Sequence, residues 1–247
     1  MTDHKLTSFV SYGNLLFKYR NVLFPVILLP LLLCLKPENP EGNIMWGWWM
    51  DLLGFLVAMT GQLIRVAVIG LAYIVRGGRD HKVYAEELVT SGIFAHCRNP
   101  LYFGNLLILL GLFIIHNNIW VYLIGVPFFL IAYMAIVAAE EFYLASRFGG
   151  DYKQYCRSTN RWLPKLKGLV PTLKGMKFHW KRVVAKDYSS FSYWVLAVIL
   201  IMAEECYYYK DDLNSPIWGI ALTIAFVFVV LMFFIARFYK KAGRLID

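Results

Sequence analysis

The chain has 247 residues, of which 59% are hydrophobic and 17% aromatic, and its mean hydropathy is +0.54. Apolar sequence of this extent excludes an ordinary soluble domain and indicates an integral membrane protein. The formal net charge is +9, but its distribution along the chain favours a membrane surface over nucleic acid as the partner.

Six apolar segments follow one another along the chain, and a membrane-crossing helix needs about 20 mostly apolar residues. They cover residues 22–35, 44–75, 101–115, 119–139, 191–209 and 217–236. These segments predict an all-α fold, a polytopic membrane bundle of about six transmembrane helices.

The third segment is short, and only His116, Asn117 and Asn118 separate it from the fourth. A connection of this length predicts a tight helical hairpin. Pro100 is expected in the first turn of the third helix, where proline is favoured. Pro127 is expected to kink the fourth helix.

Lysine and arginine positions predict the orientation of the bundle, because cytoplasmic loops are enriched in them. With a cytoplasmic N-terminus, every basic residue except Lys36, Arg65 and Lys210 falls on the cytoplasmic side. Arg76, Arg79 and Lys82 contribute to this imbalance. Both termini are therefore predicted to be cytoplasmic, in a bacterial inner membrane or the endoplasmic reticulum.

A long polar and basic stretch begins at Glu140 and exceeds the length of an ordinary loop. Residues 140–148 are predicted to continue the fourth helix and to end at Gly149 and Gly150. Residues 174–186 mix lysine and arginine with Phe178, Trp180 and other apolar residues. This part either lies flat on an anionic membrane surface or is a solvated basic loop.

Two polar clusters lie on the cytoplasmic side of the predicted hairpin. One is "GIFAHCRNPLYFGN" at residues 92–105, and the other begins with Glu140 and Glu141. Because the hairpin returns the chain to the same membrane face, Arg98, Asn99 and Tyr102 are expected close to the two acids. The combined cluster suits a small polar molecule that is bound from the cytosol and meets a lipid-dwelling partner.

Arg65 lies about 15 Å into the second apolar segment, at a helical rise of about 1.5 Å per residue. An intramembrane arginine is costly and usually faces a partner or a cavity. We predict that Arg65 faces the site and contacts Glu141 or an anionic headgroup. A purely structural bridge to an acidic or carbonyl partner remains an alternative.

The histidines and cysteines do not predict a metal site. His96 and His116 lack the spacing of metal ligands, and the four cysteines are too widely separated for a zinc cluster or a disulfide framework.

The sequences "LVTSGIFAHCRNPLYFGN" and "EEFYLASRFGGDYKQYCRSTNRWLP" resemble the two motifs of the isoprenylcysteine carboxyl methyltransferase and phospholipid methyltransferase superfamily. The resemblance covers about residues 60–164, with "GQLIRVAVIG" as a weaker upstream match. It implies an integral membrane methyltransferase that uses S-adenosylmethionine without a Rossmann domain. Three regions follow: N-terminal spans at 1–59, a methyltransferase core with the cofactor site at 60–168, and a basic segment with two C-terminal spans at 169–247.

The resemblance also implies residue roles. The catalytic candidates are Arg98, Glu141, Tyr102 and Arg65. The implied cofactor-binding residues are Gly92, Phe94, His96, Arg98, Asn99, Pro100, Tyr102, Gly104, Asn105, Glu140, Glu141 and Tyr152. Asn99 stands where the family motif most often has histidine, and Phe94 where it usually has tyrosine. Because an amide does not titrate, Asn99 cannot serve as a proton acceptor.

The expected reaction moves a methyl group from S-adenosylmethionine to a lipophilic acceptor at the cytosolic membrane face. The acceptor is a phospholipid amine or a prenylcysteine or isoprenoid carboxylate, and the motifs do not choose between them. Anionic membrane lipids are expected partners, and a homodimer is an option. The alternative enzyme is an NADPH-dependent sterol or steroid reductase, whose C-terminal motifs are similar. A small transporter or scaffold ranks third, because the span interiors are almost entirely apolar.

Overall fold

A computed structural model describes residues 3–38, 44–72, 85–209 and 216–245. Within these ranges the chain is mostly helical and contains no β-strand. The elements are α1 (Asp3–Leu33), α2 (Ile44–Leu71), the 3-10 helix η2 (Gly92–Ala95), α3 (Pro100–His116), the π-helix η3 (Val121–Gly125), α4 (Val126–Ser158), α5 (Leu169–Lys174), α6 (Trp180–Tyr208) and α8 (Pro216–Lys241).

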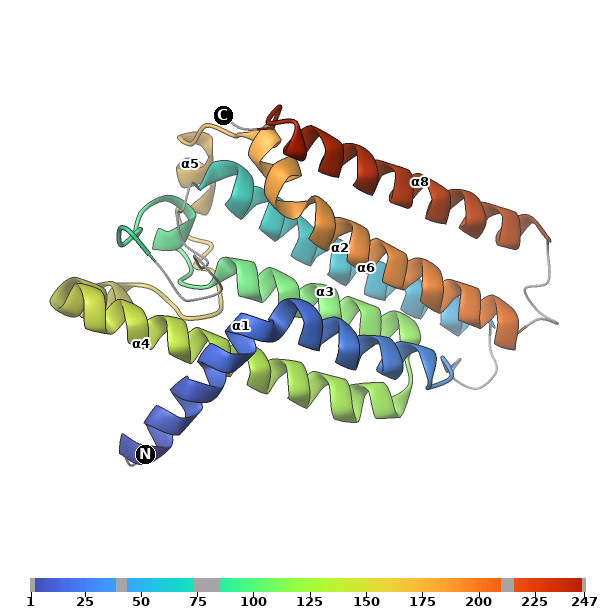
Figure 1. Cartoon of the computed structure of the whole chain (residues 1–247), viewed down its shortest axis with the longest axis horizontal. Helices are drawn as coiled ribbons and strands as arrows, with labels where there is room; N and C mark the ends of the chain where they lie inside the picture. Colours follow the sequence, from blue (N-terminus) through green and yellow to red (C-terminus); the bar gives the residue numbers. More distant parts are fainter. Residues whose placement is uncertain (1–2, 39–43, 73–84, 210–215, 246–247) are drawn as a thin grey trace.

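The long helices run roughly along one axis and form an elongated bundle (Figure 1). Five of them, belonging to α1, α2, α4, α6 and α8, are long and apolar enough to cross a membrane, and the shorter apolar α3 lies beside them. The predicted polytopic membrane bundle is therefore confirmed. The start of α1, the end of α8 and the η2 turn lie toward the same end of the bundle (Figure 1). Which side of the membrane this end faces stays a prediction.

The tight hairpin between α3 and α4 is confirmed. Pro100 occupies the first turn of α3, and Asn117 ends the helix with a left-handed φ of 52°. Pro127 was expected to kink the fourth helix. It lies instead in the first turn of α4, where a helix tolerates proline, and the irregular backbone is the π-helix η3 just before it.

The second polar cluster lies on a helix that is longer than expected. Glu140 and Glu141 are part of α4, which the sequence predicted to end at the Gly149–Gly150 pair. The helix instead kinks at Gly149, where φ is 51° and ψ is −114°, and continues to Ser158. A β-carbon at Gly149 would meet nothing within 4 Å, so backbone conformation rather than crowding selects glycine there. The kink carries Tyr152 and Tyr155 back toward η2.

The basic stretch at residues 174–186 is divided between two elements, and whether it lies on an anionic membrane surface or in solvent stays a prediction. Helix α5 ends at Lys174, and α6 begins at Trp180 and runs on without a break into the fifth predicted span. The positions Arg76, Arg79 and Lys82, which supported the orientation, and the exception Lys210 lie outside the described residues.

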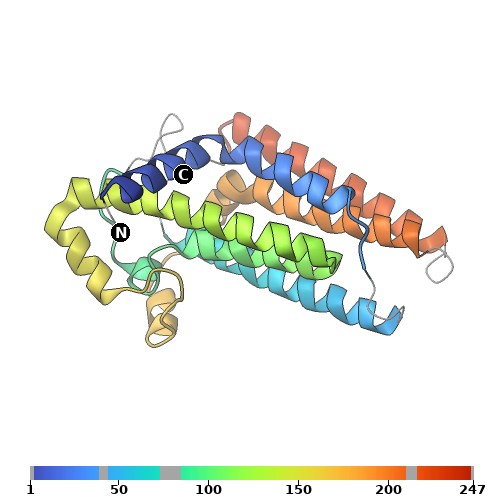
Figure 2. The same cartoon turned by 90° about the horizontal axis from the view of Figure 1, so that it is seen from below.

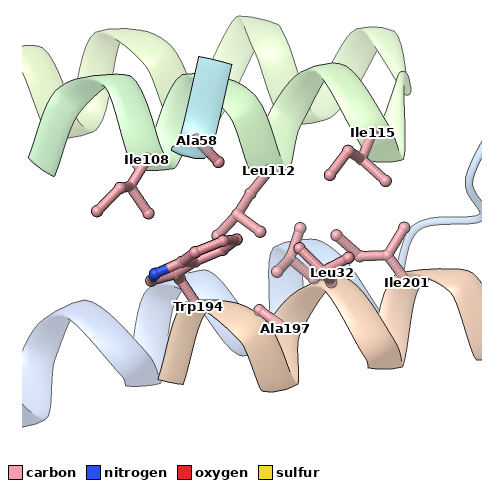
Figure 3. Packing of buried hydrophobic residues seen from close by; sticks show 9 residues of the cluster. Leu32, Ala58, Ile108, Leu112, Ile115, Trp194, Ala197 and Ile201 are labelled. Atoms are coloured by element: carbon pink, nitrogen blue, oxygen red, sulfur yellow. The ribbon is translucent and has the colours of Figure 1, made fainter. Parts of the chain in front are cut away.

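Small residues hold α2 and α3 close together. A β-carbon on Gly61 would lie 2.4 Å from the Gly104 carbonyl oxygen, and one on Gly54 would lie 2.6 Å from that of Gly111. Such close approach is typical of membrane helices with glycine at the contact. Side chains of α1, α2, α3 and α6 pack around this seam, including Leu112 and Trp194 (Figure 3).

The outer helices complete the bundle. Helix α1 packs on α4, and α8 packs on α6 at the edge (Figure 2). Only 6% of the most apolar part of α8 is buried within the protein. The rest of that helix presents apolar side chains outward, as expected of a surface in contact with lipid.

Candidate functional site

Hydrogen bonds connect the η2 turn and the residues that follow it to the end of α4 and to the segment after it. The backbone N–H of Arg98 donates to the Asn160 carbonyl (2.9 Å), and the N–H of Lys165 donates to the His96 carbonyl (2.9 Å). The Tyr155 hydroxyl donates to the Phe94 carbonyl at 2.7 Å. The two motifs, separated by the whole hairpin in sequence, therefore form one folded unit.

Gly92 is required by its backbone conformation. Its φ is +61°, which favours glycine. A β-carbon there would lie 2.7 Å from Cε of Met176, the end of a flexible side chain that can move aside, so the conformation rather than crowding selects glycine. Gly92 thus shapes the site through the backbone.

Arg98, Glu141 and Arg161 form the charged centre of the site. Nη1 of Arg98 lies 3.2 Å from Oε1 of Glu141, and Nη2 of Arg161 lies 2.9 Å from Oε2 of the same carboxylate. Nη1 of Arg98 also donates to the Cys156 sulfur at 2.7 Å. The expected proximity of Arg98 and Glu141 is confirmed, and two cations share one anion.

The environment favours the charged form of Arg98. Burial has the largest influence and lowers its pKa, but Glu141, Cys156 and Tyr152 together outweigh it, so the pKa of Arg98 is raised above its ordinary value. Burial raises the pKa of the neighbouring Cys97 thiol. Cys97 is only 1% exposed, and its sulfur donates to the Trp162 carbonyl (3.1 Å).

Among the residues that the structure describes, three buried atoms of this charged centre have no hydrogen-bond partner: Nε of Arg98, Nε of Arg161 and Oε1 of Glu141. Oε1 lies within ion-pair distance of Arg98 but accepts no well-directed hydrogen bond. Buried polar atoms are nearly always hydrogen-bonded in folded proteins. Two open donors and one open acceptor in one place are what a bound zwitterion would satisfy.

A second polar group lies one residue away along α4. The Tyr102 hydroxyl donates to Oε1 of Glu140 at 2.6 Å and accepts from Nη1 of Arg20 at 3.0 Å. The expected proximity of Tyr102 and Glu140 is confirmed. The sequence analysis did not include Arg20, which comes from α1.

Arg65 does not contact Glu141, so that half of the prediction is wrong, whereas contact with an anionic headgroup stays untested. Its Nε and Nη2 both donate to Oδ1 of Asp187 on α6, and its Nη1 donates to Oδ1 of Asn105. The carboxylate of Asp187, only 2% exposed, also accepts from Gln62 at 2.6 Å. A complete set of protein partners therefore surrounds Arg65, which corresponds to the alternative of a structural bridge.

Other predicted residues have structural partners. Gly104 lies in the α2–α3 seam, and Asn99 donates its side-chain amide to the Arg161 carbonyl at 3.2 Å. Both ring nitrogens of His96 are engaged, by the Lys165 carbonyl (2.8 Å) and the Thr172 hydroxyl (3.0 Å). Asn99 thus fixes the loop that carries Arg161, a role that requires no titration.

Four residues at or near the site were missed by sequence reasoning: Arg20, Cys156, Arg161 and Asp187. Cys156 and Arg161 lie inside the second motif, so their place in that motif was an available signal. Arg20 and Asp187 lie at the edges of other apolar segments, and only the packing of helices brings them to the site.

The part of the chain that the structure describes contains no group of three or more His, Cys, Asp or Glu side chains arranged to hold a metal ion.

Comparison with known proteins gives a family match and two relatives. Residues 49–151 match the model of the phospholipid methyltransferase family. The chain is 32% identical over 127 residues to the cobalt-zinc-cadmium resistance protein CzcN of Cupriavidus metallidurans, an alignment that covers 51% of this chain and 56% of the relative. It is 29% identical over 126 residues to the nickel-cobalt-cadmium resistance protein NccN of Alcaligenes xylosoxydans xylosoxydans, covering 51% and 57%.

The aligned part of the chain thus spans little more than half the length of these curated relatives. No solved structure matches the chain.

Proposed function

Residues 49–151 form a domain of the phospholipid methyltransferase family, part of the integral membrane methyltransferase superfamily, and from this premise we propose a specific reaction. The protein moves a methyl group from S-adenosylmethionine to a lipophilic acceptor at the cytosolic membrane face. The observation that carries the proposal is the set of open polar atoms on Arg98, Arg161 and Glu141.

The charged centre has the right chemistry for the amino-acid end of this cofactor. That end carries one carboxylate and one ammonium group. Arg98 and Arg161 each offer an open N–H for a carboxylate, and Glu141 offers an open oxygen for an ammonium group. The two arginines and one glutamate give the charged centre a net charge of one positive unit. This charge favours a ligand that places its carboxylate against the arginines.

When bound, S-adenosylmethionine supplies a methyl group on a positively charged sulfur. The work left to the protein is to align the reactants and exclude water. Tyr152, only 4% exposed, borders the charged centre beside Arg98, and the buried Phe94 packs with Val68 and Ile93. Tyr102 and Glu140 lie next to it, between the charged centre and α1. We assign these two residues to the side where the acceptor arrives.

The acceptor group decides whether a base is needed. A carboxylate acceptor needs none, whereas an amine must first lose a proton. Glu140 or Glu141 could accept that proton. The two relatives are named for resistance to metal ions, and those names specify no acceptor.

Calorimetry on the detergent-purified protein tests the proposal. S-adenosylmethionine and NADPH are titrated separately into the wild type, Glu141→Gln and the control Asp151→Asn, which removes an exposed carboxylate from the same helix. We expect S-adenosylmethionine to bind the wild type and the control, and to bind Glu141→Gln about tenfold or more weakly, because a charge-assisted hydrogen bond is lost. Binding of NADPH alone would replace the methyltransferase proposal with the reductase.

A further inference from the structure

Arg20 is positioned beside the site from outside the family domain. It belongs to α1, whereas the family match begins at residue 49. Nη1 of Arg20 donates to the Tyr102 hydroxyl at 3.0 Å, and that hydroxyl donates to Glu140 at 2.6 Å. Arg20 is thus joined to the acid pair through a single tyrosine.

The guanidinium of Arg20 is held in a fixed orientation. Its Cζ lies 4.2 Å from the ring centroid of Phe17, one turn earlier in α1, and Phe17 is only 4% exposed. Stacking on an aromatic face orients the planar guanidinium and leaves its edges available for hydrogen bonds. The geometry is that of a preorganised donor rather than a long side chain that moves freely.

Arg20 and Arg65 differ in how their charges are balanced. Arg65 forms a buried ion pair with Asp187, which uses its donors. Among the residues that the structure describes, Arg20 has no carboxylate within ion-pair distance, and its one hydrogen bond is to a neutral hydroxyl. A half-buried cation inside a membrane bundle is costly unless an anion meets it.

The position of Arg20 points to a ligand from the membrane. It lies within the apolar stretch Ser8–Leu33 of α1, and its side chain is partly accessible. A guanidinium presents paired N–H groups that match the oxygens of a phosphate or a carboxylate. An amphiphile whose tail lies among the helices would place such a group at this depth.

We infer that Arg20 binds an oxyanion, a phosphate or a carboxylate, on the lipid acceptor and so holds the acceptor's polar end against Tyr102 and Glu140. This inference rests on the proposed function, because it assigns the bound lipid to the methyl acceptor. It makes Arg20 a residue that selects anionic amphiphiles over neutral ones. It also gives α1, which lies outside the family domain, a direct part in the site.

Lipid binding to the full-length protein in detergent tests the inference, with native mass spectrometry as the readout. The probes are dioleoyl phosphatidate for a phosphate, N-acetyl-farnesylcysteine for a carboxylate, and dioleoylglycerol and N-acetyl-farnesylcysteine methyl ester as their neutral counterparts. The variants are Arg20→Gln and Arg20→Lys. Lys18→Gln is the matched control, because it removes an exposed positive charge from the same turn of α1.

We expect the wild type and Lys18→Gln to bind at least one anionic probe more tightly than its neutral counterpart. Arg20→Gln should bind that probe about tenfold more weakly, and Arg20→Lys should recover part of the loss. Loss of the phosphatidate alone identifies a phosphate as the source, and loss of the prenylcysteine alone identifies a carboxylate. Equal binding by Arg20→Gln and the wild type, or an equal loss in Lys18→Gln, would overturn the inference.

Binding of S-adenosylmethionine, measured in parallel, separates this inference from the proposed function. Arg20 does not contact the charged centre, so Arg20→Gln should bind S-adenosylmethionine as the wild type does, which also shows that the variant is folded. If the wild type binds anionic lipid through Arg20 but does not bind S-adenosylmethionine, the oxyanion site stands and the methyltransferase assignment fails. The reverse result removes Arg20 from the acceptor site and leaves the methyltransferase assignment in place.

Discussion

At the scale of single residues, Glu141 depends on two arginines, of which the sequence analysis identified only Arg98. Arg161 makes the shorter of the two ion pairs, at 2.9 Å. It was overlooked because the family resemblance implied no role for the end of the second motif, and only the folded chain shows Asn99 fixing the Arg161 backbone. The chemistry of the site therefore includes the end of the second motif.

Replacing Arg161 by glutamine should weaken S-adenosylmethionine binding. The variant removes one open N–H donor and one positive charge beside Glu141, and loss of a charge-assisted hydrogen bond costs about 1.5–3 kcal/mol. Calorimetric titration should show an affinity lowered by about tenfold or more. Arg157→Gln, which removes an exposed arginine near the end of α4, is the matched control and should bind normally. Equal affinities in both variants would exclude Arg161 from the cofactor site.

The two cysteines near the site should differ in reactivity toward maleimide. Burial raises the pKa of the Cys97 thiol, so at any given pH a smaller fraction is thiolate, which is the reactive form. Cys97 should therefore react more slowly than the exposed Cys34, and its rate should rise only at a higher pH. Peptide mass spectrometry after timed labelling from pH 7 to 9 measures both rates. A Cys97 rate that matches Cys34 across this range would contradict the buried position of Cys97.

Cys156 lies against Arg98 and is only partly buried, so a ligand on Arg98 should cover it. We expect S-adenosylmethionine to slow maleimide labelling of Cys156 and to leave the rate of Cys34 unchanged. The same timed labelling, with and without the ligand, gives the comparison. Labelling of Cys156 at an unchanged rate in the presence of saturating ligand would place the cofactor elsewhere.

At the scale of elements, the hairpin was predictable and its packing was not. A three-residue link between two apolar segments forces antiparallel helices, so the meeting of Tyr102 with Glu140 followed from chain connectivity. The choice of α2 as the close partner of α3 depends on glycines in two segments that are far apart in sequence. The family resemblance assigned Gly104 to the cofactor site, whereas its neighbours in the structure are the backbone of Gly61 and the side chain of Arg65.

Replacing Gly61 by leucine should destabilise the α2–α3 contact. Even the β-carbon would lie 2.4 Å from the Gly104 carbonyl oxygen, so the helices must separate. Forcing extra atoms into a packed contact typically costs about 1–3 kcal/mol. Thermal unfolding in detergent should show a Tm several degrees below that of the wild type. Gly219→Leu in α8, where a β-carbon meets nothing within 4 Å, should unfold as the wild type does. A similar Tm for Gly61→Leu would mean that the seam is not a tight contact.

At the scale of the whole molecule, a buried ion pair joins the region that matches the family model, residues 49–151, to the C-terminal helices. Arg65 lies inside the matched region and Asp187 lies outside it, 122 residues away in sequence. The sequence indicated that Arg65 needs a partner, because an intramembrane arginine is costly. It could not indicate which acid, because the answer depends on which helix packs against α2. The structure assigns α6, whose Trp194 also donates to Gln62 at 3.0 Å.

This ion pair predicts non-additive effects of mutation. Removing either partner leaves an unpaired charge in the bundle, which costs about 3–5 kcal/mol, whereas removing both leaves only the polar groups of Gln62 and Asn105 to be satisfied. Arg65→Met and Asp187→Leu should therefore each lower the Tm strongly. The double variant should lose less stability than the two single variants lose together. Thermal unfolding of the four proteins in one detergent completes the cycle. Strictly additive losses would show that Arg65 and Asp187 act independently, and α6 would then be attached to residues 49–151 without a contribution from this ion pair.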